Sequence, residues 1–97
     1  MNYWLHPEAG NDLGDAARFY LQQADAILAQ SFLAEFERTV GLILQDPGAG
    51  ARWQNDKRRF MMRRFPFSVI YTVSDGEVRI LAIAHHSRRP GFWRGRK

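Results

Sequence analysis

The sequence predicts an α+β fold in which a short N-terminal strand and a helical hairpin pack on a three- to four-stranded antiparallel sheet, in the order β-α-α-β-β-β. Two runs rich in β-branched and aromatic residues flank an Asp-Gly turn, and two earlier segments show helical periodicity. The chain is 97 residues long, which leaves room for one hydrophobic core. We therefore expect a single domain over residues 1–97, with a basic aromatic tail at 87–97.

The predicted hairpin joins Phe67–Val73 to Val78–Ala84. Asp75 and Gly76 suit the two positive-φ positions of a type I′ turn. This turn pairs Val73 with Val78 and, if the register stays regular, Val69 with Ala82 and Phe67 with Ala84. One face is then wholly apolar, and we expect the helices to cover it: Phe67, Val69, Tyr71, Val73, Val78, Ile80, Ala82 and Ala84. The opposite face carries a smaller apolar patch, made of Ile70, Leu81 and Ile83.

The remaining elements are predicted from periodicity and from residues that begin or end helices. Tyr3-Trp4-Leu5 suits a short first strand, and Pro7 suits the first turn of a helix that runs to about residue 24. A second apolar stripe predicts a helix over about 25–45, which the Asp-Pro-Gly-Ala-Gly stretch at 46–50 ends. Arg58–Arg64 then reads as a strand antiparallel to Phe67–Val73.

Composition excludes several kinds of site. There is no cysteine, so disulfides, thiolate metal sites and a cysteine nucleophile are excluded. His85 and His86 are adjacent and point to opposite faces of a strand, so we expect no metal site and no cofactor. No apolar run approaches the roughly 18 residues of a membrane span, and no signal segment opens the chain. We expect a cytoplasmic protein that does not bind membranes.

Charge is divided unevenly between the two halves of the chain. Residues 1–50 carry a net charge of −5, whereas residues 51–97 carry +9. The cations interleave with aromatic residues at 58–65 and at 88–96, a mixture that suits an anionic partner. The alternative is that the first cluster only solubilises strand edges. For the tail we favour a binding role, because an arginine-rich tail with an exposed tryptophan has little folding rationale.

Two blocks of the sequence resemble the ParE/RelE family of bacterial toxins. They are RRFPFSVIY at 63–71, followed by the Asp-Gly hairpin, and AHHSRRPGFW at 84–93. The helix pair upstream also fits the family pattern. The resemblance implies the toxin of a type II toxin–antitoxin module, of the kind that inhibits growth and stabilises plasmids. A cognate antitoxin is expected to wrap and neutralise it.

The family divides into gyrase poisons similar to ParE and ribosome-dependent mRNA endoribonucleases similar to RelE. The RelE-like enzymes have an arginine on the middle strand and a tyrosine in the tail, where this chain has Ser68 and Trp93. These differences favour a ParE-like poison that binds an essential target such as DNA gyrase and is not an enzyme. The alternative is an endoribonuclease acting on ribosome-bound mRNA with a separate set of candidate catalytic residues, namely Arg63, Arg64, His85, His86 and Arg88.

Two binding surfaces follow from these arguments. We expect the tail to engage the toxic target through its cations and large aromatic rings: Arg88, Arg89, Phe92, Trp93 and Arg94. The other possibility is that Trp93 folds back onto the helices. We expect the antitoxin to contact the patch of Ile70, Leu81 and Ile83 with an acidic segment, drawn in by the basic half of the chain.

Overall fold

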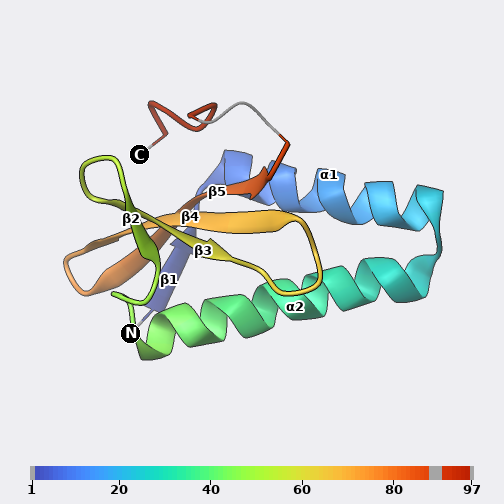
Figure 1. The fold of residues 1–97 in the computed structure, drawn as a ribbon, viewed down its shortest axis with the longest axis horizontal. Coiled ribbons are helices and arrows are strands. Elements are labelled where there is room, and N and C mark those ends of the chain that lie inside the picture. Colours follow the sequence, from blue (N-terminus) through green and yellow to red (C-terminus); the bar gives the residue numbers. More distant parts are fainter. Residues whose placement is uncertain (1, 88–90, 97) are drawn as a thin grey trace.

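A computed structural model describes residues 2–87 and 91–96. Two helices pack as an antiparallel pair against a five-stranded sheet (Figure 1). The elements, in chain order, are β1 (Asn2–Leu5), α1 (Pro7–Gln23), α2 (Ala26–Gln45), β2 (Ala51–Trp53), β3 (Lys57–Met61), β4 (Phe67–Ser74) and β5 (Glu77–His85). The predicted α+β class is confirmed. No helix within the described ranges is long and apolar enough to cross a membrane.

Both helices begin at capped N-termini. Pro7 occupies the first turn of α1, and Nδ1 of His6 accepts a hydrogen bond of 3.0 Å from the backbone N–H of Glu8. Asp25 caps α2, since its carboxylate accepts from the backbone N–H of Leu28 at 2.8 Å. Only Ala24 and Asp25 lie between the two helices, so the predicted helical hairpin is confirmed.

The sheet order is β1-β5-β4-β3-β2, and β1 is the only strand that runs parallel to its neighbour among the described pairs. The sequence did not predict β2. This strand pairs with β3 through a tight turn in which Gln54 and Asn55 both have positive φ, at 41° and 52°. The third predicted strand, Arg58–Arg64, is shorter in the structure, where β3 ends at Met61.

The β4–β5 hairpin has the predicted turn but a shifted register. Asp75 and Gly76 adopt φ of 52° and 73°, and Val73 pairs with Val78 as expected. A bulge then inserts one residue, Leu81, so that Ile70 pairs with Ala82. The pairings expected beyond this point, Val69 with Ala82 and Phe67 with Ala84, are therefore wrong: the observed partners are Ile83 and His85.

The main core lies between the helices and the sheet. Its buried members include Phe32 and Phe36 from α2 and Val69, Tyr71 and Ile83 from the sheet. Phe67, Val69 and Tyr71 face the helices as predicted, but Val73, further along β4, is 41% exposed. The bulge reverses the faces expected for three residues, because Ile83 faces the helices while Ala82 and Ala84 do not.

A second, smaller core covers the face of the sheet that the helices leave free. We call it the open-face cluster. Its buried members come from β4, β5 and the C-terminal tail, and two partly buried rings pack against them: Ile70, Ala82, Ala84 and Trp93, with Trp53 and Phe92. The tail thus crosses the sheet on the side opposite the helices, and the sheet is covered on both faces over its middle strands.

Candidate functional site

The C-terminal tail packs on the sheet, and Trp93 is its main contact. This side chain is 5% exposed and belongs to the open-face cluster. Its ring centroid lies 6.1 Å from that of Trp53, and Phe92 packs edge-on against it at 5.1 Å. The expectation of an exposed Trp93 is therefore wrong, and the tryptophan does not plug the helices either. It covers the opposite face, where small residues of β5 leave space for a large ring.

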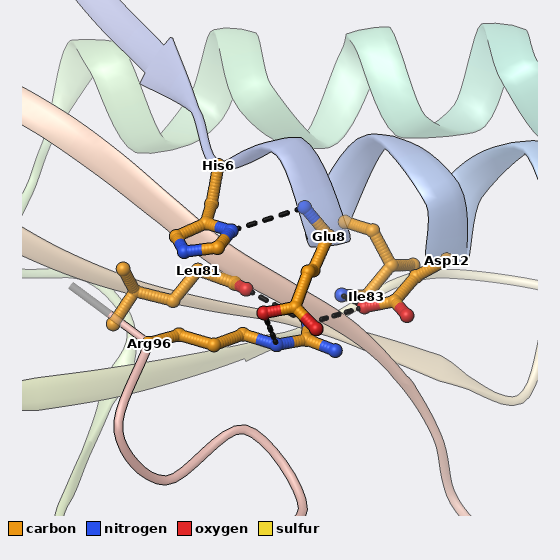
Figure 2. Close-up of polar contacts among 6 residues, drawn as sticks. All are labelled: His6, Glu8, Asp12, Leu81, Ile83 and Arg96. Carbon is orange, nitrogen blue, oxygen red and sulfur yellow. Dashed lines mark hydrogen bonds and ion pairs between the residues drawn. The ribbon is translucent and has the colours of Figure 1, made fainter.

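Arg96 fastens the end of the tail to the start of α1 (Figure 2). Its Nη1 lies 2.7 Å from Oδ2 of Asp12 and donates to the backbone oxygen of Leu81 at 3.0 Å. Its Nε lies 3.7 Å from a carboxylate oxygen of Glu8, and its guanidinium carbon lies 5.2 Å from the ring centroid of Phe92. The Arg96 and Asp12 side chains are only 11% and 12% exposed, so solvent screens this pair poorly.

These contacts also complete the free edge of β5 where β1 ends. The ladder between the two strands covers Glu77 to Ile80, and β1 stops at Leu5. Further along β5, the carboxylate of Asp12 accepts from the backbone N–H of Ile83 at 3.1 Å. Side chains from α1 and the tail thus satisfy backbone groups that a longer neighbouring strand would otherwise pair. The position of the tail is therefore tied to the edge of the sheet.

The residues predicted to bind the toxic target lie in different environments. Arg94 is exposed, Phe92 is half-buried and Trp93 is buried. Arg88 and Arg89 lie outside the described residues. Target binding by these five stays a prediction. The buried rings fix the path of the tail, and Arg94 is the member that the described part of the tail presents to solvent.

The patch predicted for the antitoxin is not one surface. Ile70 is completely buried within the open-face cluster, whereas Ile83 is 3% exposed and faces the helices. Leu81 is 2% exposed, and its backbone oxygen is bonded by Arg96. The bulge at Leu81 explains this separation, because it places consecutive residues of β5 out of alternation. An antitoxin contact at these residues stays a prediction, and it requires the tail to move.

A small hollow of about 60 Å³ lies between the tail and the end of β5. It is lined by Trp53, Arg59, Ser68, Ala84, His85, His86 and Trp93. Ser68 occupies the middle-strand position where a RelE-like enzyme is expected to have arginine, and its Oγ lies 3.0 Å from Nε2 of His86. Nδ1 of His85 accepts from the backbone N–H of Ser87 at 3.0 Å. Although they are adjacent in sequence, both histidines reach this hollow.

Only part of the candidate catalytic set lies there: the two histidines line the hollow, and Arg88 lies outside the described residues. Arg63 and Arg64 are not among the lining residues. The backbone N–H of Arg63 donates instead to Glu35 at 2.9 Å, and the Arg64 guanidinium lies 5.6 Å from the ring centroid of Phe65. No carboxylate lines the hollow to orient His86. Within the described ranges, no three side chains of the metal-binding kinds gather into a site.

Arg58 and Arg59 belong to one basic cluster in the sequence, but they face opposite sides of the sheet. Arg59 lies over the ring of Trp53 at 5.5 Å and lines the hollow on the open face. Arg58 pairs with Tyr71, so it lies on the helix side, where it pairs on its other flank with Arg52. The alternation of side chains along a strand was the signal that distinguishes them. Arg52 was not singled out because β2 was not predicted.

Comparisons with known proteins agree with this fold. A family model described as "ParE toxin of type II toxin-antitoxin system, parDE" matches residues 3–90. A solved structure described as "Chromosomal ParDE TA system from P. aeruginosa" has a TM-score of 0.78 at 23% sequence identity, and the alignment covers 88% of this chain and 95% of that chain. No curated protein shows significant similarity. The chain belongs to the ParE toxin family of type II toxin–antitoxin systems.

Proposed function

We propose that this chain inhibits growth by binding an essential cytoplasmic target, of which DNA gyrase is the first candidate, and that a cognate antitoxin neutralises it. The membership of the ParE toxin family supports the toxin role. Gyrase as the target and neutralisation by an antitoxin extend this role and are our proposals.

The identity and burial of Ser68 and Trp93 favour a binding mechanism over nuclease chemistry. Both stand where a RelE-like enzyme is expected to have catalytic side chains. Ser68 is 1% exposed and bonded to His86, and Trp93 is 5% exposed within the open-face cluster. Neither side chain supplies the cation or the acidic hydroxyl that RNA cleavage needs at those positions. This supports a toxin that acts by binding.

In this proposal the tail has two parts with different roles. Trp93 and Phe92 position the tail on the sheet, and the exposed Arg94 contacts the target together with Arg88 and Arg89. Arginine beside a rigid aromatic support is a common arrangement at the centre of protein interfaces. Fastening by Arg96 lowers the conformational freedom that the tail would lose on binding.

Induction of the chain in bacterial cells, followed by primer extension on abundant mRNAs, tests the binding mechanism. We expect growth to stop without new mRNA ends, because the proposed toxin leaves RNA intact. The Tyr71→Asp variant is the control for toxicity that depends on folding, since a charge at this fully buried position is expected to unfold the domain. Cuts at defined codon positions in the induced cells would show that the endoribonuclease alternative is correct.

A further inference from the structure

Two arginines face each other across the hairpin formed by β2 and β3. Arg52 and Arg58 are direct register partners, so their side chains leave the sheet on the same face. Among the residues that the structure describes, neither guanidinium has an ion-pair partner. Like charges directly opposite each other destabilise a strand pair. The Arg52–Arg58 pair is therefore locally unfavourable for stability. Locally unfavourable arrangements of this kind are typical of binding sites.

Arg58 is held in place before any partner binds. Its Nη1 donates to the backbone oxygens of Gly48 and Gly50, at 3.1 and 2.9 Å. The loop that carries these oxygens is itself fixed by Tyr71, whose hydroxyl donates to the Pro47 oxygen at 2.8 Å and accepts from the Gly50 N–H at 3.0 Å. One nitrogen of the guanidinium is thus oriented by a loop that the buried Tyr71 holds in place. A cation fixed in this way loses little freedom on binding an anion.

The two arginines open onto a hollow of about 250 Å³ at the corner of the sheet. It is lined by Arg52, Asn55, Asp56, Lys57, Arg58 and Val73. Three of the six are cations and one is an acid. Val73 is 41% exposed even though Tyr71, on the same face of the same strand, is completely buried. The hollow therefore combines excess positive charge with an aliphatic side chain that the helices do not cover.

We propose that this hollow binds an acidic segment of a protein partner, with carboxylates on Arg52 and Arg58 and an aliphatic side chain on Val73. Arginine accepts carboxylates with paired hydrogen bonds, and apolar contact beside arginine is typical of protein interfaces. A nucleic acid is disfavoured because no aromatic ring lines the hollow to stack bases. Trp53, the tryptophan of this hairpin, belongs to the open-face cluster instead.

We identify the partner as the antitoxin, and this step rests on the proposed function. The acidic and aliphatic chemistry of the bound segment is inferred from the hollow alone. The hollow is open in the present structure. Binding there needs no movement of the tail, unlike a contact at Ile70 or Leu81, which are both buried. The site therefore offers an acidic partner a first contact on the basic half of the chain, where electrostatic attraction also speeds the encounter.

Fluorescence anisotropy with the full chain and a labelled synthetic peptide of repeated Glu-Leu-Asp-Glu units tests this proposal. We expect Arg52→Glu to weaken peptide binding by about tenfold or more. The same variant is expected to raise the melting temperature by roughly 1–5 °C, because a glutamate at this position pairs with Arg58 across the strands. Opposite effects on stability and binding are the signature of a site that trades one for the other.

Arg64→Glu is the matched control, because it makes the same change in net charge at an exposed position outside the hollow. We expect it to weaken peptide binding much less and not to raise the melting temperature. Equal loss of binding in the two variants, or no peptide binding by the unaltered chain, would overturn the proposal. The proposal would also be overturned if the chain bound oligothymidine more tightly than the peptide, with the peptide competing for the same site and Arg52→Glu abolishing oligothymidine binding. Gyrase inhibition is measured separately on the unaltered chain, so failure of the proposed target leaves the peptide result standing.

Discussion

Tyr71 links the sheet to the loop that follows α2. Its side chain is completely buried, and its hydroxyl is bonded both to the Pro47 oxygen and to the Gly50 N–H. Burial raises the pKa of the Tyr71 phenol, so the hydroxyl keeps its proton to donate. A Cβ atom at position 50 would lie 2.6 Å from the tyrosine oxygen, so only glycine lets the loop approach this closely. One hydroxyl thus fixes the loop that orients Arg58.

Removing this hydroxyl is expected to destabilise the fold measurably. Tyr71→Phe leaves the Gly50 N–H and the Pro47 oxygen without their buried partner, at a cost of about 1–3 kcal/mol in the free energy of unfolding. Urea denaturation measures this change. Tyr3→Phe is the control, because Tyr3 is 39% exposed. Equal stability of Tyr71→Phe and the unaltered chain would mean that the loop is not held by this hydroxyl.

Glu35 is a nearly buried carboxylate that joins α2 to the turn between β3 and β4. It is 8% exposed and accepts two hydrogen bonds from Arg38, at 2.9 and 2.7 Å, and one from the backbone N–H of Arg63 at 2.9 Å. The hydrogen bonds from Arg38 are the main reason that the pKa of Glu35 is lowered, and the Arg63 N–H lowers it further against the effect of burial.

This lowered pKa makes the stability of the fold depend on pH. The folded chain binds the Glu35 proton less tightly than the unfolded chain does. The stabilisation is therefore fully present above the ordinary glutamate pKa and is lost as the pH falls through the folded value. We expect Glu35→Gln to lower stability at about pH 7, with a gap that shrinks towards about pH 3. Urea denaturation at both pH values checks this, with the exposed Glu37→Gln as control. A gap that is the same at both values would contradict the assignment.

At the scale of elements, different residues of the tail have different roles: Trp93 stabilises the fold, and Arg94 is proposed to bind the target. Single substitutions at these two positions test the roles separately. Trp93→Ala uncovers the open-face cluster and is expected to cost about 3–5 kcal/mol in the free energy of unfolding. Arg94→Ala, at an exposed position, is expected to leave stability within about 0.5 kcal/mol and to abolish growth arrest. Thermal denaturation and induction in cells measure the two effects. Full toxicity of a folded Arg94→Ala chain would remove Arg94 from the target-binding surface.

The elements were predictable where periodicity was strong and long. Both helices and the Asp75–Gly76 turn follow from patterns that extend over many residues or from specific turn chemistry. The strand β2 has three residues and is identified only through its pairing with β3. The bulge left no trace in the sequence, because every residue from Ile80 to Ala84 is apolar and alternation therefore carries no signal there. The prediction that Ile70, Leu81 and Ile83 form one surface patch failed because this bulge was not predicted.

At the scale of the whole molecule, the family could be recognised from sequence blocks, but the arrangement of the surface could not. The blocks at 63–71 and 84–93 sufficed for the resemblance, which the family model bears out over residues 3–90. Which arginines lie together depends on pairings between distant segments, as in the ion pair of Arg96 with Asp12 across 84 positions. The burial of Trp93 likewise depends on small side chains of β5 that the shifted register places beneath it.

A supercoiling assay with purified DNA gyrase tests the central claim most directly. The full chain is expected to inhibit supercoiling as its concentration rises, while folded Arg94→Ala is expected to have little effect. Full gyrase activity at chain concentrations that arrest growth would contradict gyrase as the target. If codon-positioned mRNA cuts appear in the same cells, the chain acts as an endoribonuclease instead.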